Sequence, residues 1–378
     1  MGVIKQHIKD FATDRRAWLL MVVFFGVQAV LFYQTGMVTT LEAEKYIREG
    51  TELAANGNLT ETRFVFYLPV ILLVSICRLL HLSLYFVIII QVLCSAISLY
   101  CFYRVAAHLS TKTWALGVAL LLAVCIPVQQ WNMYVYSDSL FISLSVIFFS
   151  VLYFSSINKT CNWKVLLIIP VVWCFARPAG LLFVLPMFVL LFNIKRKQKW
   201  ILFTALGALL LMIIAASAYF NGGGDLDTLK PYIEEHIICF VPQNTAGANL
   251  NIVHTSNQLN DLFYYILHNP GHFISLLAQK LVSFFNLTRP WYSLSHNIVM
   301  VLLMLPVYLF FIPGIIRLFR THRSFAWFVI SVLFIYPVGV VLQCDDWHNR
   351  FTMPVFPLMM LTAFYGLYHL VHNIQSKK

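Results

Sequence analysis

Residues 17–36 read AWLLMVVFFGVQAVLFYQTG and contain no charged side chain. As a helix, about 20 apolar residues are long enough to cross a bilayer core of about 30 Å. Similar runs recur along the chain, which is 60% hydrophobic and 11% charged with a mean hydropathy of +0.78. A soluble domain carries about 25% charged residues. The pattern predicts an all-α, polytopic integral membrane protein with one transmembrane domain over residues 1–378.

Ten runs are candidates to cross the membrane. They are 17–36, 83–103, 114–130, 139–156, 165–176, 179–193, 200–220, 296–316, 325–342 and 353–372. The stretch 64–82 is also apolar, but it contains Pro69, Arg78 and His81. It could cross, or it could lie along the membrane surface as an amphipathic helix.

The basic residues favour one topology, because cytoplasmic loops carry an excess of Lys and Arg. If the amino terminus is inside and 64–82 does not cross, 17 of the 26 Lys and Arg fall inside with only two of the 15 acids, Asp10 and Asp14. If 64–82 crosses, every later loop changes sides, unless 165–193 forms a single helix. That helix would place Arg177 at mid-bilayer, where an isolated arginine is costly. We therefore expect ten crossings, both termini in the cytoplasm, and an inner (cytoplasmic) membrane or an equivalent lumen-facing one.

The remaining composition adds three expectations. The net charge of +11 comes from residues that flank the spans, which indicates contact with anionic membrane lipid and no nucleic-acid partner. The first helix lacks an A-x-A-like cleavage site and is expected to be retained. The eight cysteines form no C-x-x-C, and only Cys239 and Cys344 fall on the outer face, where a disulfide between them is one option.

Two long segments lie outside under this topology, the first outer loop 37–82 and the large outer loop 221–295. In the first, a short helix is expected to end at Asn56-Gly57. In the second, Leu259, Leu262 and Ile266 repeat at helical spacing before the break at Asn269-Pro270-Gly271. We expect these helices to lie on the membrane surface and to roof a cavity.

Charged residues stand at the outer ends of the spans in four short stretches. These are LEAEKY with Glu42 and Glu44, YSDSLF with Asp138, ARPAG with Arg177, and CDDWHNRF with Asp345, Asp346, His348 and Arg350. They could be ordinary loop residues: Asp138 would favourably face a helix dipole, and Glu44, Glu49 and Glu52 would form a solvated face.

Taken in order, these stretches resemble a known family. Glu42 lies four residues before Tyr46, Tyr67-Leu68-Pro69 and Asp138 follow, and then Arg177-Pro178-Ala179-Gly180 and the H-N-R-F-x-x-P-x-x-P pattern of His348 to Pro357. Together they resemble the polyprenyl-phosphate-sugar-dependent glycosyltransferases of the GT-C superfamily, which includes protein O-mannosyltransferases and lipid A aminoarabinose transferases. The family's first outer loop holds an Asp, often in an acidic pair, where this chain has Glu42-Ala43-Glu44.

The resemblance implies an inverting transfer of a sugar from a polyprenyl-phosphate donor to a hydroxyl of a glycan, lipid or protein acceptor. That chemistry needs a base, and Glu42 is the first candidate with Glu44 as the alternative. We expect partial desolvation to raise the pKa of Glu42. Asp138 would assist the base, Tyr46 would support it, and Asp345 or Asp346 would hold Arg350.

The departing phosphate needs a cation, for which Arg350 is the first candidate because a guanidinium pairs with phosphate oxygens. Supporting cations are Arg289, Arg177, Lys280 and His348. Arg289 could instead lie at the membrane interface beside Trp291 and Tyr292, and Lys280 could be a surface lysine.

No metal or other cofactor is expected, because there is no D-x-D and the histidines show no ligand spacing. Three alternatives remain open. The protein could be a transporter or flippase of a lipid-linked sugar, another membrane transferase such as an O-antigen ligase, or a noncatalytic scaffold. A transporter would place charges near mid-membrane and is not supported by internal repeats.

Overall fold

The computed structural model describes residues 13–158, 163–194, 207, 210, 211, 214, 229–239, 241, 250–255, 257–342, 344 and 346–375. Within these ranges the chain is helical, with two isolated β-bridges and no strand, which confirms the all-α prediction. The helices are α2 (Arg15–Thr35), α3 (Glu42–Asn56), η1 (Thr62–Tyr67), α4 (Leu68–Leu79), α5 (Tyr85–Leu109), α6 (Lys112–Ala123), α7 (Ile126–Gln129), η2 (Gln130–Met133), α8 (Ser137–Asn158), α9 (Trp163–Ala176), η3 (Pro178–Phe183), α10 (Val184–Ile194), α12 (Lys230–Ile233), α13 (Gln258–His268), α14 (Pro270–Phe285), α15 (Leu294–Thr321), α16 (Arg323–Val341) and α17 (Phe356–Gln375).

Six helical stretches of the described residues are long and apolar enough to cross a membrane, as expected of a multi-pass membrane protein. They are α2, η1 with α4, α5, α8, α15 and α16, and the bent pair of α6 with α7 and η2 makes a seventh. The count of ten is not confirmed: α9 and α10 are shorter than a span, and most of 200–220 lies outside the described residues.

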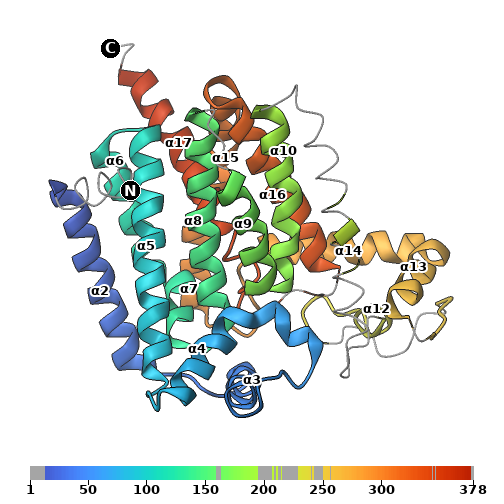
Figure 1. Cartoon of the computed structure of the whole chain (residues 1–378). Helices are drawn as coiled ribbons and strands as arrows, with labels where there is room; N and C mark the ends of the chain where they lie inside the picture. Colours follow the sequence, from blue (N-terminus) through green and yellow to red (C-terminus); the bar gives the residue numbers. More distant parts are fainter. Residues whose placement is uncertain are drawn as a thin grey trace.

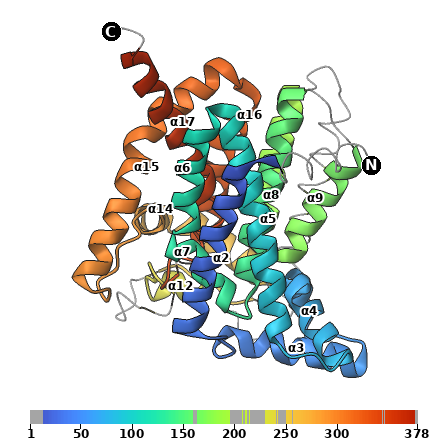
Figure 2. The ribbon, with the colours of Figure 1, turned by 90° about the vertical axis from the view of Figure 1, so that its left-hand side faces the viewer.

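The segment 64–82 forms the end of η1 and the whole of α4. Alone, α4 has 12 residues, about 18 Å at 1.5 Å per residue, so the segment reaches spanning length only with η1. Helix α4 packs against α3, and both lie at the end of the bundle where α2 ends and α5 begins (Figures 1 and 2). This position suits a helix at the membrane surface.

The long helices pack most closely where glycine allows backbones to meet. A Cβ on Gly314 of α15 would lie 1.9 Å from the carbonyl oxygen of Thr362 in α17, and one on Gly366 would lie 2.4 Å from that of Phe310. Small residues at such crossings let membrane helices approach without a hydrophobic driving force. The contact fixes α17, and with it the loop that precedes α17.

The opposite end of the bundle holds the start of α2, which begins at Arg15 (Figure 1). Asp14 caps α2 by accepting a 3.1 Å hydrogen bond from the backbone N–H of Arg16, and it also accepts one from Tyr103 at 2.9 Å. Lys112 at the start of α6 pairs with the same carboxylate at 3.2 Å. One of the two acids expected on the cytoplasmic side therefore belongs to a helix cap.

Helix α14 runs across the direction of the long helices. It lies sideways in Figure 1 and is seen end-on in Figure 2. Together with α13 it forms a small apolar cluster around Tyr265 and Leu276, which also includes Tyr232 of α12. The helices predicted in the large outer loop are present, with a break between α13 and α14 at Asn269.

Candidate functional site

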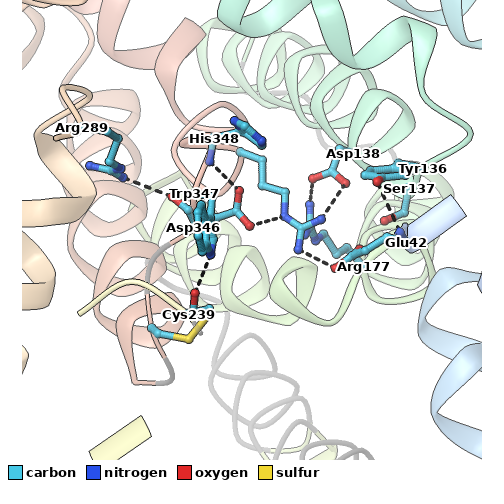
Figure 3. Close-up of polar contacts among 12 residues, drawn as sticks. Glu42, Tyr136, Ser137, Asp138, Arg177, Cys239, Arg289, Asp346, Trp347 and His348 are labelled. Atoms are coloured by element: carbon cyan, nitrogen blue, oxygen red, sulfur yellow. Dashed lines mark hydrogen bonds and ion pairs between the residues drawn. A yellow bond between two sulfur atoms is a disulfide. The ribbon is translucent and has the colours of Figure 1, made fainter. Parts of the chain in front are cut away.

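Arg350 is the centre of an ion-pair cluster whose carboxylates are those of Glu42, Asp138 and Asp346, all labelled in Figure 3. Its Nη2 lies 2.7 Å from Oε1 of Glu42, and its Nε lies 2.9 Å from Oδ2 of Asp346. Its Nη1 is 4.0 Å from Oδ2 of Asp138. One guanidinium thus faces three carboxylates from α3, α8 and the loop before α17. Burial lowers the pKa of Arg350, but Asp346 and Glu42 outweigh it and raise the pKa.

Asp138 in the first turn of α8 forms a second, fully buried pair with Arg177. The ARPAG sequence explains how the arginine reaches it: Arg177 precedes the turn η3, whose Gly180 folds back onto the last turn of α9. A Cβ at Gly180 would lie 2.0 Å from the carbonyl oxygen of Trp173, so only glycine fits there. Asp138 is therefore more than a helix cap, since it neutralises a buried arginine.

Phe351 joins the two arginines. Its ring centroid lies 5.0 Å from the guanidinium carbon of Arg177 and 5.2 Å from that of Arg350. Both distances are within the range of cation–π attraction. The aromatic residue of the H-N-R-F pattern thus helps hold both cations in place.

Glu42 reaches the cluster because the chain before α3 is pinned to the loop before α8. Val38 and Tyr134 form a parallel bridge, with the N–H of Val38 donating to Met133 at 2.9 Å. The hydroxyl of Tyr136 accepts from the N–H of Glu42 and lies 3.3 Å from the carbonyl oxygen of Thr40. These contacts set the first turn of α3 beside Asp138.

The carboxylate of Glu42 is surrounded by cations. Lys45 lies 3.4 Å from Oε2, and the Tyr46 hydroxyl lies 3.5 Å from the same oxygen. Burial raises the pKa of Glu42, but Arg350, Lys45 and Arg177 outweigh it and hold the pKa well below its usual range. The expectation of a raised pKa is wrong for the site as described, because the charge of the neighbours dominates over desolvation.

The loop that carries Asp346 and Arg350 is held to the large outer loop by a disulfide and by hydrogen bonds. Cys239 and Cys344 form a disulfide with a Cα–Cα distance of 5.2 Å, and Trp347 Nε1 donates to the carbonyl oxygen of Cys239 at 2.6 Å (Figure 3). Asn349 Nδ2 donates to the carbonyl oxygen of Leu287 at 2.8 Å. The large outer loop thus supports the site through backbone contacts.

The predicted cations divide into two groups. Arg350 and Arg177 lie in the cluster, whereas Arg289 is 3% exposed and its NH groups donate to carbonyl oxygens, including that of Asp346 at 3.3 Å. Arg289 thus supports the loop and is too buried to snorkel. His348 is exposed, and its backbone N–H donates to Oδ1 of Asp346 at 3.0 Å (Figure 3).

Lys280 is fully buried, so the surface-lysine alternative is wrong. Its Nζ lies 4.3 Å from the ring centroid of Tyr232, away from the ion-pair cluster, and burial lowers its pKa from 10.5 to about 7.

The predicted acids also separate. Glu44 is exposed, because two residues along a helix point to nearly opposite sides, so the geometry favours Glu42 over Glu44. Asp345 lies outside the described residues. Glu49 is not on a solvated face: it is fully buried and accepts from the backbone N–H of Thr60 at 2.9 Å, which fixes the turn that follows α3.

Sequence reasoning missed Lys45, Tyr136 and Phe351. Lys45 could have been found, because residues three apart share a helix face and Lys45 follows Glu42 by three. Nothing local in the sequence indicates that Tyr136 bonds to the turn before Glu42.

An apolar groove of about 510 Å³ runs between α14 and α15, close to the loop that supports the site. It is lined by Leu281, Val282, Phe285, Asn286, Leu287, Thr288, Met300, Val301, Met304, Leu305 and Tyr308. The carbonyl of Leu287 is the one that binds Asn349, next to Arg350. Among the described residues no group of three or more His, Cys, Asp and Glu is placed to hold a metal ion.

No protein-family model matches the chain, and searches of curated proteins and of solved structures return no match either.

Proposed function

We propose that this protein is a membrane glycosyltransferase that moves a sugar from a polyprenyl-phosphate donor to an acceptor hydroxyl. The observation that carries the proposal is the cluster of Glu42, Asp138 and Arg350. In it the candidate base, Glu42, and the candidate phosphate-binding cation, Arg350, form an ion pair, and Asp138 lies beside them. These residues come from three separate parts of the sequence whose order resembles that of the GT-C glycosyltransferases.

The reaction would use the two charges in turn. Glu42 takes the proton of the acceptor hydroxyl while the acceptor oxygen attacks the anomeric carbon of the sugar. The bond between that carbon and the phosphate oxygen breaks, and its electron pair leaves with the lipid phosphate. Arg350 stabilises the charge on the phosphate, and a single displacement inverts the anomeric configuration.

The groove between α14 and α15 offers a place for the lipid tail. Its lining is almost wholly apolar, and its Leu287 end is bonded to the residue before Arg350. A phosphate near Arg350 would then sit at the membrane boundary, with its isoprenoid chain in contact with the bilayer. The proposal needs no metal ion or other cofactor.

The proposed orientation places the cluster outside an inner membrane and both termini in the cytoplasm, with about ten crossings in all. The positive-inside distribution supports it, and so does the disulfide, because disulfides persist in oxidising compartments.

A transporter of lipid-linked sugar is the second candidate, and an O-antigen ligase the third. The charges favour an enzyme: Asp138 lies in the first turn of α8, and the cluster sits at an end of the bundle, whereas a transporter site lies near the midplane. The ligase reading shares the lipid-linked donor and differs in the acceptor.

The test is transfer of a radiolabelled sugar from a polyprenyl-phosphate donor to its acceptor by the purified protein. Glu42→Gln should abolish transfer, and Glu44→Gln reports on the alternative base. Glu52→Gln is the matched control, since Glu52 lies on the same helix and bonds only locally, to Asn56 at 2.8 Å. Donor binding or movement without turnover would favour the transporter.

A further inference from the structure

Among the residues that the structure describes, the charges of the cluster balance. Three carboxylates, those of Glu42, Asp138 and Asp346, face three cations. The cations are Lys45, Arg177 and Arg350. An anion that enters such a site must compete with a carboxylate for a cation, because burying extra negative charge without a partner is costly.

The three carboxylates differ in how easily they can give way. The side chain of Asp138 is fully buried and shares its oxygens between two arginines. That of Asp346 is 13% exposed and also accepts the backbone N–H of His348 at 3.0 Å. The side chain of Glu42 is 31% exposed and keeps Lys45 as a partner when Arg350 is removed. Glu42 is therefore the carboxylate that an incoming anion displaces most readily.

We propose that the phosphate group of the donor displaces Glu42 from Arg350, so that the base becomes available only when a donor is bound. This inference rests on the proposed function and adds the order of events at the site. While it is paired with Arg350, Glu42 is a poor proton acceptor. Donor binding would exchange the Glu42–Arg350 pair for a phosphate–Arg350 pair and leave Glu42 facing the acceptor.

The consequence is a coupling between donor binding and the protonation of Glu42. The groups that face Glu42 are Lys45 and Tyr46 of α3, Tyr136 and Asp138 at the start of α8, Arg177, and Arg350 with Asp346 from the loop before α17. Of these, Arg350 is the strongest charge partner that holds its pKa down. When Arg350 turns to the phosphate, the pKa of Glu42 rises, so the carboxyl takes up a proton at mildly acidic pH.

The experiment measures binding of farnesyl phosphate, a short unglycosylated lipid phosphate, to the purified protein. Glu42→Gln removes the competitor of the phosphate but keeps the shape of the side chain. It should bind farnesyl phosphate at least about fivefold more tightly than the wild type, although it no longer transfers sugar. Glu52→Gln is the control and should bind like the wild type.

Proton uptake on ligand binding gives a second measurement. The loss of the negative charge of Glu42 could by itself tighten phosphate binding, but it would not explain proton uptake by the wild type. Titration calorimetry at about pH 5.5 in two buffers of different ionisation enthalpy counts the protons bound with the ligand. The wild type should take up more protons than Glu42→Gln, since titration of the phosphate itself is common to both. Equal uptake, or weaker binding by Glu42→Gln, would overturn the exchange.

The outcomes separate the two proposals. If the wild type transfers sugar but Glu42→Gln binds farnesyl phosphate no more tightly than the wild type, the exchange alone is refuted. Inorganic phosphate is titrated in parallel. If it binds as tightly as farnesyl phosphate and also binds Glu42→Gln more tightly than the wild type, the exchange stands and the lipid donor of the proposed function is refuted.

Discussion

Glu42 and Arg350 are 308 residues apart in the sequence and form an ion pair of 2.7 Å. Each follows a residue with a positive φ angle, Leu41 at 60° and Asn349 at 59°. Asparagine tolerates this conformation, whereas leucine rarely adopts it. Unfavourable backbone angles persist where the surroundings fix them, often at functional sites. Here they immediately precede both members of the ion pair and direct the two side chains towards each other.

Arg350→Lys should reduce sugar transfer by about 100-fold or more, although it keeps the charge. A lysine ammonium cannot contact Glu42, Asp346 and Asp138 at once in the way that the guanidinium does. The measurement is kcat/KM for the lipid-linked donor. The matched control is Arg48→Lys, since Arg48 is exposed and pairs only with its neighbour Glu49. Near wild-type activity in Arg350→Lys would show that charge alone suffices.

Asp138→Asn should destabilise the protein by about 3–5 kcal/mol, because it leaves the buried guanidinium of Arg177 without its carboxylate. Arg177→Met should cost a similar amount, because it leaves the buried Asp138 with only the more distant Arg350, at 4.0 Å, among the described residues. The double variant should recover much of the loss, since both buried charges are then gone. The free energy of unfolding in detergent, taken through the double-mutant cycle, measures the coupling. Losses that simply add would mean that the two residues are not paired.

Reduction of the Cys239–Cys344 disulfide should lower both stability and transfer activity. The bond joins residues 105 apart, and closing a loop of that length is worth about 4.7 kcal/mol in the chain-entropy account. Cys239→Ser should reproduce the effect of reductant and abolish its further action, whereas Cys94→Ser, within helix α5, should not.

The same bond tests which side of the membrane the cluster faces. Free thiols are blocked in intact cells, and the protein is then reduced and labelled with a maleimide polymer. Two labels that appear only after reduction place the cluster in an oxidising compartment. Cysteines 239 and 344 that are already blocked before reduction would contradict the outward orientation.

The fold class and the side of the bundle that carries the charges could be predicted from the sequence. Apolar length identifies spanning helices such as α5, and charges between such runs must collect at their ends. The count of crossings could not be predicted from apolar length alone, because α4 has only 12 residues and reaches spanning length only together with η1.

The partners within the site were predicted in part. The sequence indicated Glu42, Asp138, Arg177 and Arg350, yet it could not show that Asp138 belongs to Arg177 and that Arg350 is shared. Those pairings depend on contacts between distant segments. The direction of the pKa shift of Glu42 was predicted wrongly for the same reason. Desolvation can be inferred from the position of Glu42 in the sequence, whereas the charges that surround it in the fold cannot.

Lys280→Met should stabilise the protein, and by an amount that depends on pH. Lys280 is fully buried, and its pKa falls from 10.5 in an unfolded chain to about 7. Between these values the unfolded state binds more protons than the folded state, so the stability contributed by Lys280 rises with pH through this window. Below pH 7 the cost of burying the ammonium is at its greatest, about 5 kcal/mol at roughly 1.4 kcal/mol for each pH unit between the two pKa values. Methionine has nearly the same length and no charge to desolvate, so its advantage should be largest at pH 6 and should shrink towards pH 10.

Thermal unfolding in detergent at several pH values measures this gain in stability. Lys230→Met is the control, because Lys230 is an exposed lysine on the neighbouring helix α12. A gain that does not change with pH would contradict the lowered pKa of Lys280.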